Sequence, residues 1–270
     1  MTLSNLVLAA ITAAATVAPV AGGSGMLPPA PPAPAPPVIA RPAAPVRPAV
    51  EHPADLLDLS SWKLTLPEGE EGKPREVMPP ALPEFSNEFF RLTDAGDAVL
   101  FTAEVGGVTT KNSSYPRSEL REMQGGENAS WSNTSGRHVL NVRAAILAVP
   151  KVKPEIVAAQ IHDGDDDVLQ IRLEGERLMV QYDDGAGETV LDPAYSIGTP
   201  FDISIIAADS RIEVLYNGTK KADLDESGTG WYFKVGAYVQ SSPEKGDQVG
   251  TPGTVAVYSL ELSHTEGSPA

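Results

Sequence analysis

Cysteine is absent from the 270 residues of this chain. Its absence excludes disulfide bonds and any metal site built on thiolates. A folded domain of this sequence must therefore be held together by its hydrophobic core alone, without covalent cross-links.

Basic residues are also few, since 20 Lys and Arg stand against 36 Asp and Glu and give a net charge of −16. The first 54 residues carry a net charge of +1, so the remainder carries about −17. Such a surface argues against nucleic acid, whose binding needs a basic footprint. It argues against an anionic polysaccharide too, unless Lys and Arg gather locally in one groove.

Helical periodicity is the third thing that the sequence lacks, because no stretch of fifteen residues shows a clear 3.6-residue period. Short stretches instead alternate apolar and polar residues, at 62–67, 138–149, 168–185, 201–218 and 254–263. Three of the turns, LEGER, AADSR and YDDGAG, have hairpin spacing. The pattern predicts an all-β fold, an antiparallel β-sandwich of the jelly-roll type.

The N-terminal region differs in composition from the rest. Residues 1–27 resemble a signal peptide, with an apolar run that Pro19 interrupts, and we expect a secreted protein without a membrane span in its mature form. Residues 28–54 form a Pro/Ala-rich segment that predicts either a stiff polyproline linker or a disordered spacer. Residues 55–270 then form one domain, which we expect to be monomeric.

The apolar run IVAAQIH at 156–162 ends in two polar residues that a strand would place on one face. With a period of two, Ile156, Ala158, Gln160 and His162 share a face, while Val157, Ala159 and Ile161 share the other. An amide beside an imidazole is unusual on a packing surface. We interpret the first face as a binding surface.

Two further strands follow the same rule. In YPRSELREM, Arg117, Glu119 and Arg121 share a face, and the glutamate can hold both guanidinium groups. An edge strand with a charged solvent face is the alternative. In WYFKVGAYVQ, one face is apolar and Gly236 leaves room on the other for a ligand. The residues of that second face are Tyr232, Lys234, Gly236, Tyr238 and Gln240. An ordinary half-buried strand is the alternative here.

YPRSELRE, QIH and YFKVGAYVQ resemble, in this order, the three motifs of the alginate lyases of polysaccharide lyase family 7. LSSWKLTLP and GVTTKNSSYPRSELRE extend the resemblance over about 56–263. It implies a jelly roll with a concave groove that binds alginate, a linear polyuronate, without a required metal or other cofactor. Isoleucine in QIH is associated in this family with guluronate-containing stretches.

The chemistry of such a lyase suits the residues found here. β-Elimination requires that the C6 carboxylate be neutralised, that a base take the C5 proton and that an acid protonate O4. Arg117 and Gln160 suit the first task, His162 the second and Tyr238 the third. The resemblance implies these four as the catalytic set, and it places the substrate-binding or supporting residues at Glu119, Arg121, Lys234 and Gln240.

Four aspartates follow His162 at positions 163, 165, 166 and 167. Their spacing suggests calcium, but the loop lacks the glycine and terminal glutamate of an EF-hand. We favour solvated turn residues, with a structural calcium as the alternative. His52, His138 and His264 have no comparable partners in sequence, and we expect surface or core positions for them.

Two other functions fit parts of the pattern. A non-catalytic carbohydrate-binding jelly roll would need the groove but not His162 and Tyr238. A glycoside hydrolase would need two carboxylates facing each other across the substrate. Glu119 and Glu122 lie on opposite faces of a strand, which disfavours the hydrolase.

Overall fold

The computed structural model describes residues 50–265. The predicted signal region and all but the end of the predicted linker lie outside the described residues. Residues 50–265 contain sixteen strands and three 3₁₀-helices, η1 at Pro53–Asp55, η2 at Leu82–Glu84 and η3 at Pro243–Lys245. Each helix is three residues long, as the missing helical periodicity predicts. None of the described helices has the length and apolar character needed to cross a membrane.

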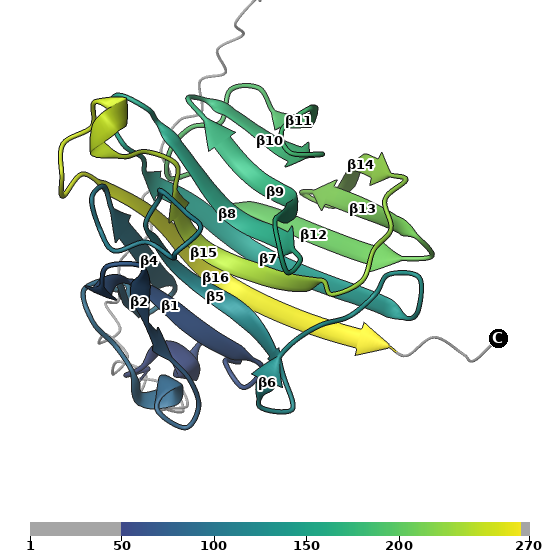
Figure 1. Cartoon of the computed structure of the whole chain (residues 1–270), viewed down its shortest axis with the longest axis horizontal. Coiled ribbons are helices and arrows are strands. Elements are labelled where there is room, and N and C mark those ends of the chain that lie inside the picture. The colour runs from purple at the N-terminus through teal and green to yellow at the C-terminus, as the bar shows by residue number, and fades with distance from the viewer. Residues whose placement is uncertain (1–49, 266–270) are drawn as a thin grey trace, which may run out of the picture. The chain divides into compact units, whose positions relative to one another are not determined.

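The first sheet carries all three sequence motifs. Its strands pair antiparallel in the order β11-β10-β9-β8-β15-β5-β1-β2, and β6 pairs with β5. The bounds are β1 Trp62–Glu70, β2 Lys73–Val77, β5 Arg117–Gln124, β6 Glu127–Asn128, β8 Glu155–His162, β9 Asp167–Glu174, β10 Arg177–Tyr182, β11 Gly187–Asp192 and β15 Tyr232–Val239. Strand β15 therefore lies between β8 and β5 (Figure 1).

The second sheet packs against the first and has the order β14-β13-β12-β7-β16-β4-β3. The bounds are β3 Phe90–Leu92, β4 Val99–Glu104, β7 Arg137–Ala148, β12 Phe201–Ala208, β13 Arg211–Tyr216, β14 Thr219–Leu224 and β16 Pro252–Thr265. All pairings in both sheets are antiparallel, and the three predicted hairpins are β9–β10, β10–β11 and β12–β13. The predicted antiparallel sandwich is confirmed.

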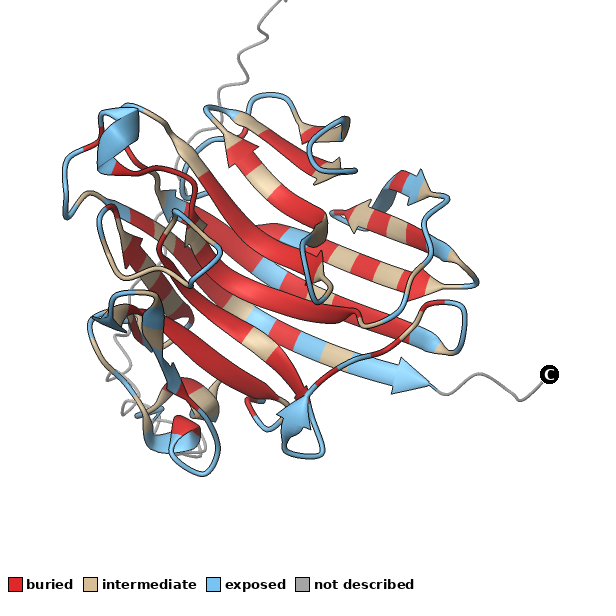
Figure 2. Cartoon of the chain, in the orientation of Figure 1, coloured by how far each residue is buried: buried red, intermediate tan, exposed pale blue. Residues whose placement is uncertain are grey.

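A continuous apolar core fills the space between the sheets. Figure 2 shows buried residues running along the central strands, with exposed residues at the loops. Phe101 from β4, Leu120 from β5 and Val235 from β15 are fully buried in this core. Apolar side chains at alternate positions supply it without any cross-link, because burial of each large side chain contributes about 1.5–3 kcal/mol.

A β-bulge changes the predicted faces of β8. Val157 pairs with Arg172 and Ala159 with Ile171, so Ala158 is an extra residue in the β8–β9 ladder. The extra residue reverses the alternation N-terminal to it. Ile156 consequently joins the core, whereas Val157 does not. The predicted faces of these two residues were wrong.

Gly236 also serves a different purpose from the one predicted. A Cβ atom added there would lie 2.4 Å from the carbonyl oxygen of Ser118 and 3.0 Å from the Phe101 ring. The glycine therefore allows β15 to approach the backbone of β5 and the core, and it does not open space for a ligand.

Glu122 on β5 ties the first sheet to the second from the face opposite Glu119. This carboxylate is 1% exposed. It accepts hydrogen bonds from Trp131 Nε1 at 2.9 Å and from the Phe233 backbone N–H at 2.8 Å. Its other oxygen lies 2.9 Å from His264 Nε2 on β16. One buried carboxylate thus satisfies donors from three segments.

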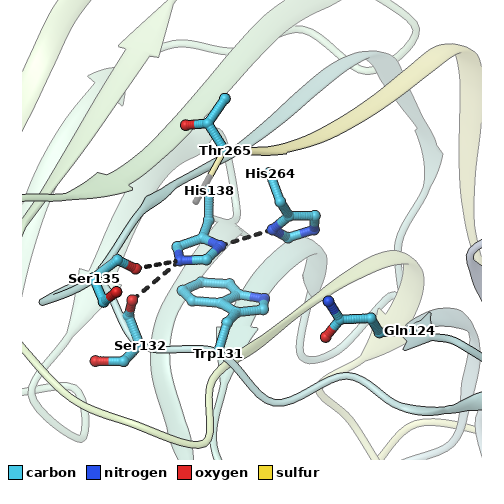
Figure 3. A pocket seen from close by; sticks show the side chains of 7 residues that line it. All are labelled: Gln124, Trp131, Ser132, Ser135, His138, His264 and Thr265. Carbon is cyan, nitrogen blue, oxygen red and sulfur yellow. Dashed lines mark hydrogen bonds between the residues drawn. The ribbon is translucent and has the colours of Figure 1, made fainter. Parts of the chain in front are cut away.

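Two of the histidines without sequence partners meet on the second sheet, as Figure 3 shows, and one of them, His264, contacts this carboxylate. His138 and His264 lie with their Nδ1 atoms 2.7 Å apart, and His138 stacks on Trp131 with 4.3 Å between the ring centroids. His138 Nε2 donates to the carbonyl oxygens of Ser132 and Ser135. Burial lowers the pKa of His138 below its ordinary value. Both histidines serve the junction between the sheets.

Replacement of Glu122 should therefore destabilise the fold strongly. Glu122→Leu has a similar volume but leaves the Trp131 and Phe233 donors buried without an acceptor, which we expect to lower the free energy of unfolding by about 3 kcal/mol. Urea unfolding measures this change. Exposed Glu127 on β6 provides the control, because Glu127→Gln should change stability by less than about 0.5 kcal/mol. Equal effects of the two variants would contradict the prediction.

Candidate active site

Three neighbouring strands bring the sequence motifs together. Lys234 on β15 pairs with Gln160 on one side and with Arg121 on the other, and Tyr238 pairs with Arg117. Directly paired residues in a sheet present their side chains to the same face. Side chains separated by more than a hundred residues in the chain thereby share one surface.

Glu119 is the hub of the site. It is 1% exposed, and its Oε2 lies 2.6 Å from Lys234 Nζ and 3.2 Å from Arg117 Nη1. Its Oε1 accepts a hydrogen bond from Gln160 Nε2. Burial by itself raises the pKa of Glu119, but the charges of Lys234 and Arg117 outweigh it and hold the pKa below its ordinary value. The carboxylate is therefore charged and fixes three side chains.

Lys234 has a strongly shifted pKa. Burial, and then the charge of Arg117, lower the pKa of Lys234 to about 8, although Glu119 opposes the shift. An ordinary lysine has a pKa near 10.4. Lys234 therefore carries its charge at neutral pH but loses it under mildly alkaline conditions.

His162 lies at the C-terminal end of β8, with its side chain partly exposed. Burial, followed by the charge of Lys234, lowers the pKa of His162 below its ordinary value. The imidazole is consequently neutral at pH 7, which is the form that a general base requires.

Tyr238 is held on two sides. The Arg117 guanidinium carbon lies 3.7 Å from the centre of its ring. The Tyr238 hydroxyl forms a hydrogen bond of 2.9 Å with Ser113 Oγ. The cation–π contact fixes the ring, and the hydroxyl remains on the polar side of the sheet.

A pocket of about 380 Å³ lies over these residues. Six of the eight predicted site residues line it directly, together with Tyr232 and the loop residues Thr110 to Ser113. These six are Arg117, Arg121, Gln160, His162, Lys234 and Tyr238. Glu119 lies beneath the lining residues, so the structure places it as a support for them.

Gln240 stands apart from the other predicted residues. It lies in a neighbouring depression that shares Tyr238 with the pocket and also contains Arg172. Its amide oxygen accepts a hydrogen bond of 3.4 Å from Arg172 Nη1, and its buried Nε2 has no partner among the described residues. It is not part of the pocket itself.

Ser113 was missed by the sequence analysis. It belongs to the loop before β5, where no alternation of apolar and polar residues marks a side chain as facing the site. The sequence analysis noted this segment only as part of GVTTKNSSYPRSELRE, which extends the resemblance to the family. A serine in such a loop carries no signal of its own, because loops lack a fixed side-chain period.

The aspartate loop borders the pocket. Asp165, Asp166 and Asp167 contribute to its lining. Asp163 Oδ1 accepts the backbone N–H groups of Asp165 and Asp166, both at 2.8 Å, which is the geometry of a turn. Within residues 50–265, no group of three or more His, Asp or Glu side chains is arranged to hold a metal ion.

Comparisons with known proteins identify the family and the fold. The sequence pattern of a family described as alginate lyase matches residues 57–264. The solved alginate lyase AlgAT5 of polysaccharide lyase family 7 is 45% identical, with a TM-score of 0.76 over 79% of this chain and 99% of its own. The alginate lyase from Corynebacterium sp. is 42% identical, with a TM-score of 0.77 over 80% of this chain and 99% of its own.

Two more distant matches complete the comparison. An alginate lyase from Klebsiella pneumoniae is 39% identical over 85 residues, which are 30% of this chain and 28% of that protein. A family 7 alginate lyase solved with a substrate (GGMG), in which one histidine and one tyrosine are replaced, is 27% identical with a TM-score of 0.70, over 83% of this chain and all of its own. The chain belongs to the alginate lyases of polysaccharide lyase family 7.

Proposed function

We propose that the chain cleaves alginate by β-elimination in this pocket, with Arg117, Gln160, His162 and Tyr238 as its catalytic residues. The observation that carries the proposal is their convergence. A general base, a phenol that can act as general acid and two hydrogen-bond donors suited to a carboxylate come from three strands, and they line one pocket. The relative solved with a substrate carries replacements of a histidine and a tyrosine, as expected if those residue types perform the reaction.

The reaction follows from the positions of these groups. Arg117 and Gln160 hold the C6 carboxylate and reduce its charge, so that negative charge can develop at C5. Nε2 of His162 takes the C5 proton, and the electron pair of the C5–H bond forms the C4–C5 double bond. The C4–O4 bond breaks, and Tyr238 gives its phenolic proton to O4.

Gln160 has the hydrogen-bonding capacity for this role. One N–H of its Nε2 is used by Glu119, and the amide retains a second N–H. Its Oε1 is buried and has no partner among the described residues. The free donor can bind a carboxylate oxygen, while Oε1 can accept a sugar hydroxyl.

Guluronate-containing stretches are the substrate that we propose for this chain. Ile161 stands in the QIH position that the family associates with them. In guluronate, the C5 proton and O4 leave from opposite sides of the ring, so elimination needs two separate groups, and His162 and Tyr238 supply them. For mannuronate, Tyr238 would serve as both base and acid.

Separate guluronate and mannuronate blocks test the proposal. Cleavage creates a conjugated unsaturated uronate, which is followed by its ultraviolet absorbance. We expect a faster rise with guluronate blocks. A faster rise with mannuronate would overturn the preference, and no rise with either block on folded protein would favour a non-catalytic binding role.

The shifted pKa of Lys234 predicts the alkaline limit of activity. We propose that Lys234 and Arg121 contribute positive charge to substrate binding, and that the more distant Gln240 contributes an uncharged amide. The charge is present below the pKa of Lys234, about 8, and is lost as the pH rises through it. The value of kcat/KM should therefore fall on the alkaline side with a midpoint near pH 8.

Lys234→Arg provides the matched variant, because a guanidinium stays charged throughout this range. Its alkaline limb should move to higher pH, even if its activity at pH 7 is lower. An alkaline limb at the same pH in both proteins would assign it to another group.

Secretion completes the proposal. The apolar run at residues 3–21 is typical of a signal peptide, and a polymeric substrate must be cut before uptake. Mass spectrometry of the protein from culture medium would identify a cleaved N-terminus, and retention of the intact chain inside the cell would contradict export.

A further inference from the structure

The protonated side of His162 is held by two oxygen atoms. Its Nδ1 lies 2.7 Å from the backbone carbonyl oxygen of Asp163 and 3.1 Å from the hydroxyl oxygen of Tyr232. A carbonyl oxygen can only accept, so Nδ1 carries a hydrogen. In the neutral ring Nε2 is then bare.

The hydroxyl of Tyr232 consequently acts as a second acceptor. Since Nδ1 is the donor of this pair, the Tyr232 oxygen receives one branch of a shared Nδ1–H bond. Tyr232 is 7% exposed and lines the same pocket as His162. The contact therefore lies in a largely water-excluded place, where a hydrogen bond to a charged ring has its greatest effect.

The ring of Tyr232 adds a second contact. It stacks on the His162 ring, with 5.4 Å between centroids and 19° between planes. The Arg121 guanidinium carbon lies 3.9 Å from the centre of the same Tyr232 ring. Because β15 lies between β8 and β5, Tyr232 stands on the strand that separates His162 from Arg121. An aromatic face attracts both cations.

We propose that Tyr232 is the positioning residue of His162: its hydroxyl and ring stabilise the imidazolium that forms when His162 takes the C5 proton. The inference rests on the proposed role of His162 as base. Tyr232 itself transfers no proton. It holds the imidazole plane and accepts the hydrogen that the positive ring donates more strongly than the neutral ring.

The charges around His162 explain why such support is needed. Positive Lys234 on β15 and Arg117 on β5 oppose an imidazolium, while negative Glu119 on β5 and Asp166 in the following loop favour it. Burial opposes the charged ring most strongly and lowers its pKa. A hydrogen-bond acceptor on Nδ1 favours the charged ring, so it partly offsets the effect of burial on the pKa of His162.

Tyr232→Phe tests the hydroxyl, because it retains the ring and removes only the oxygen. We expect kcat/KM to fall about tenfold with little change in KM, as for loss of one hydrogen bond to a charged group. The acid limb of the pH profile should move to lower pH, since the imidazolium loses a stabilising acceptor. Tyr232→Leu also removes the ring and should lose more activity.

Tyr182→Phe is the control, since it removes a hydroxyl from β10 of the same sheet outside the pocket. Nitrogen-15 NMR of folded Tyr232→Phe gives a readout independent of turnover, and the titration midpoint of His162 should fall. An unchanged midpoint with an unchanged acid limb would overturn the positioning role, whatever the activity. If His162→Ala retains turnover, the proposed base is wrong instead, and the two failures are thereby distinguished.

Discussion

Replacing Tyr238 with phenylalanine should reduce the turnover of alginate by about 10²–10⁴-fold, the usual contribution of a general acid. Phenylalanine retains the ring over Arg117 and loses the hydroxyl and its bond to Ser113. Alginate should therefore still bind with nearly unchanged affinity, because the groups that hold the carboxylate stay in place. Initial rates from ultraviolet absorbance and calorimetric titration with guluronate oligomers separate the two effects.

Tyr258→Phe is the matched control for this variant, because it removes a hydroxyl from β16 in the other sheet. It should behave like the unmodified enzyme in both measurements. Turnover near that of the unmodified enzyme in Tyr238→Phe would exclude the phenol as the acid. Loss of binding together with turnover would instead make Tyr238 a substrate-binding group.

Glu119→Gln should damage both activity and stability, although it never needs to touch the substrate. The amide cannot neutralise Lys234 and Arg117, and one end of it presents a donor to other donors. Breaking a buried ion pair in this way costs about 3–5 kcal/mol. We expect kcat/KM to fall by about 10²-fold or more, because the groups that bind the carboxylate lose their fixed positions.

The same change should move the alkaline limb of activity. Glu119 is the group that raises the pKa of Lys234 against burial. Without it, Lys234 should lose its proton at lower pH. The midpoint of the alkaline limb should then lie below about pH 8. A pH profile of Glu119→Gln with an unshifted limb would contradict the assignment.

Glu213→Gln is the control for Glu119→Gln, because it removes a carboxylate from an exposed ion pair instead of a buried one. Glu213 lies 3.1 Å from Lys220 in an ion pair on the second sheet, with both side chains substantially exposed. Exposed pairs contribute about 0–1 kcal/mol. Urea unfolding should therefore distinguish the two variants clearly, and equal losses would mean that Glu119 is not a buried hub.

Alternation predicted the faces of β5 well and those of β8 only in part. In β5, Glu119 and Glu122 face opposite sides, as a period of two requires. In β8, Gln160 and His162 share the pocket face, but Ile156 and Val157 exchange faces across the bulge at Ala158. A bulge adds one residue without a distinctive side chain, so alternation cannot locate it.

The role of Glu119 depended on its partners rather than on its own strand. In the sequence it is one charged residue between two arginines, and an exposed strand would look the same. Burial by Lys234 from β15 and Gln160 from β8 makes it the hub of the site. Gly236 is similar, because only the nearby β5 backbone and Phe101 explain why a side chain is excluded there.

By itself, the sequence determined the fold class, the polar and apolar faces of most strands and the residue types available for catalysis. These properties are local, since they follow from side-chain period and composition along a few consecutive residues. Only the tertiary structure decided which strands are neighbours and in which register, and hence that β5, β8 and β15 combine their polar faces into one pocket. Pairing between strands so distant in the chain follows from packing the whole core, and no short stretch of sequence contains that information.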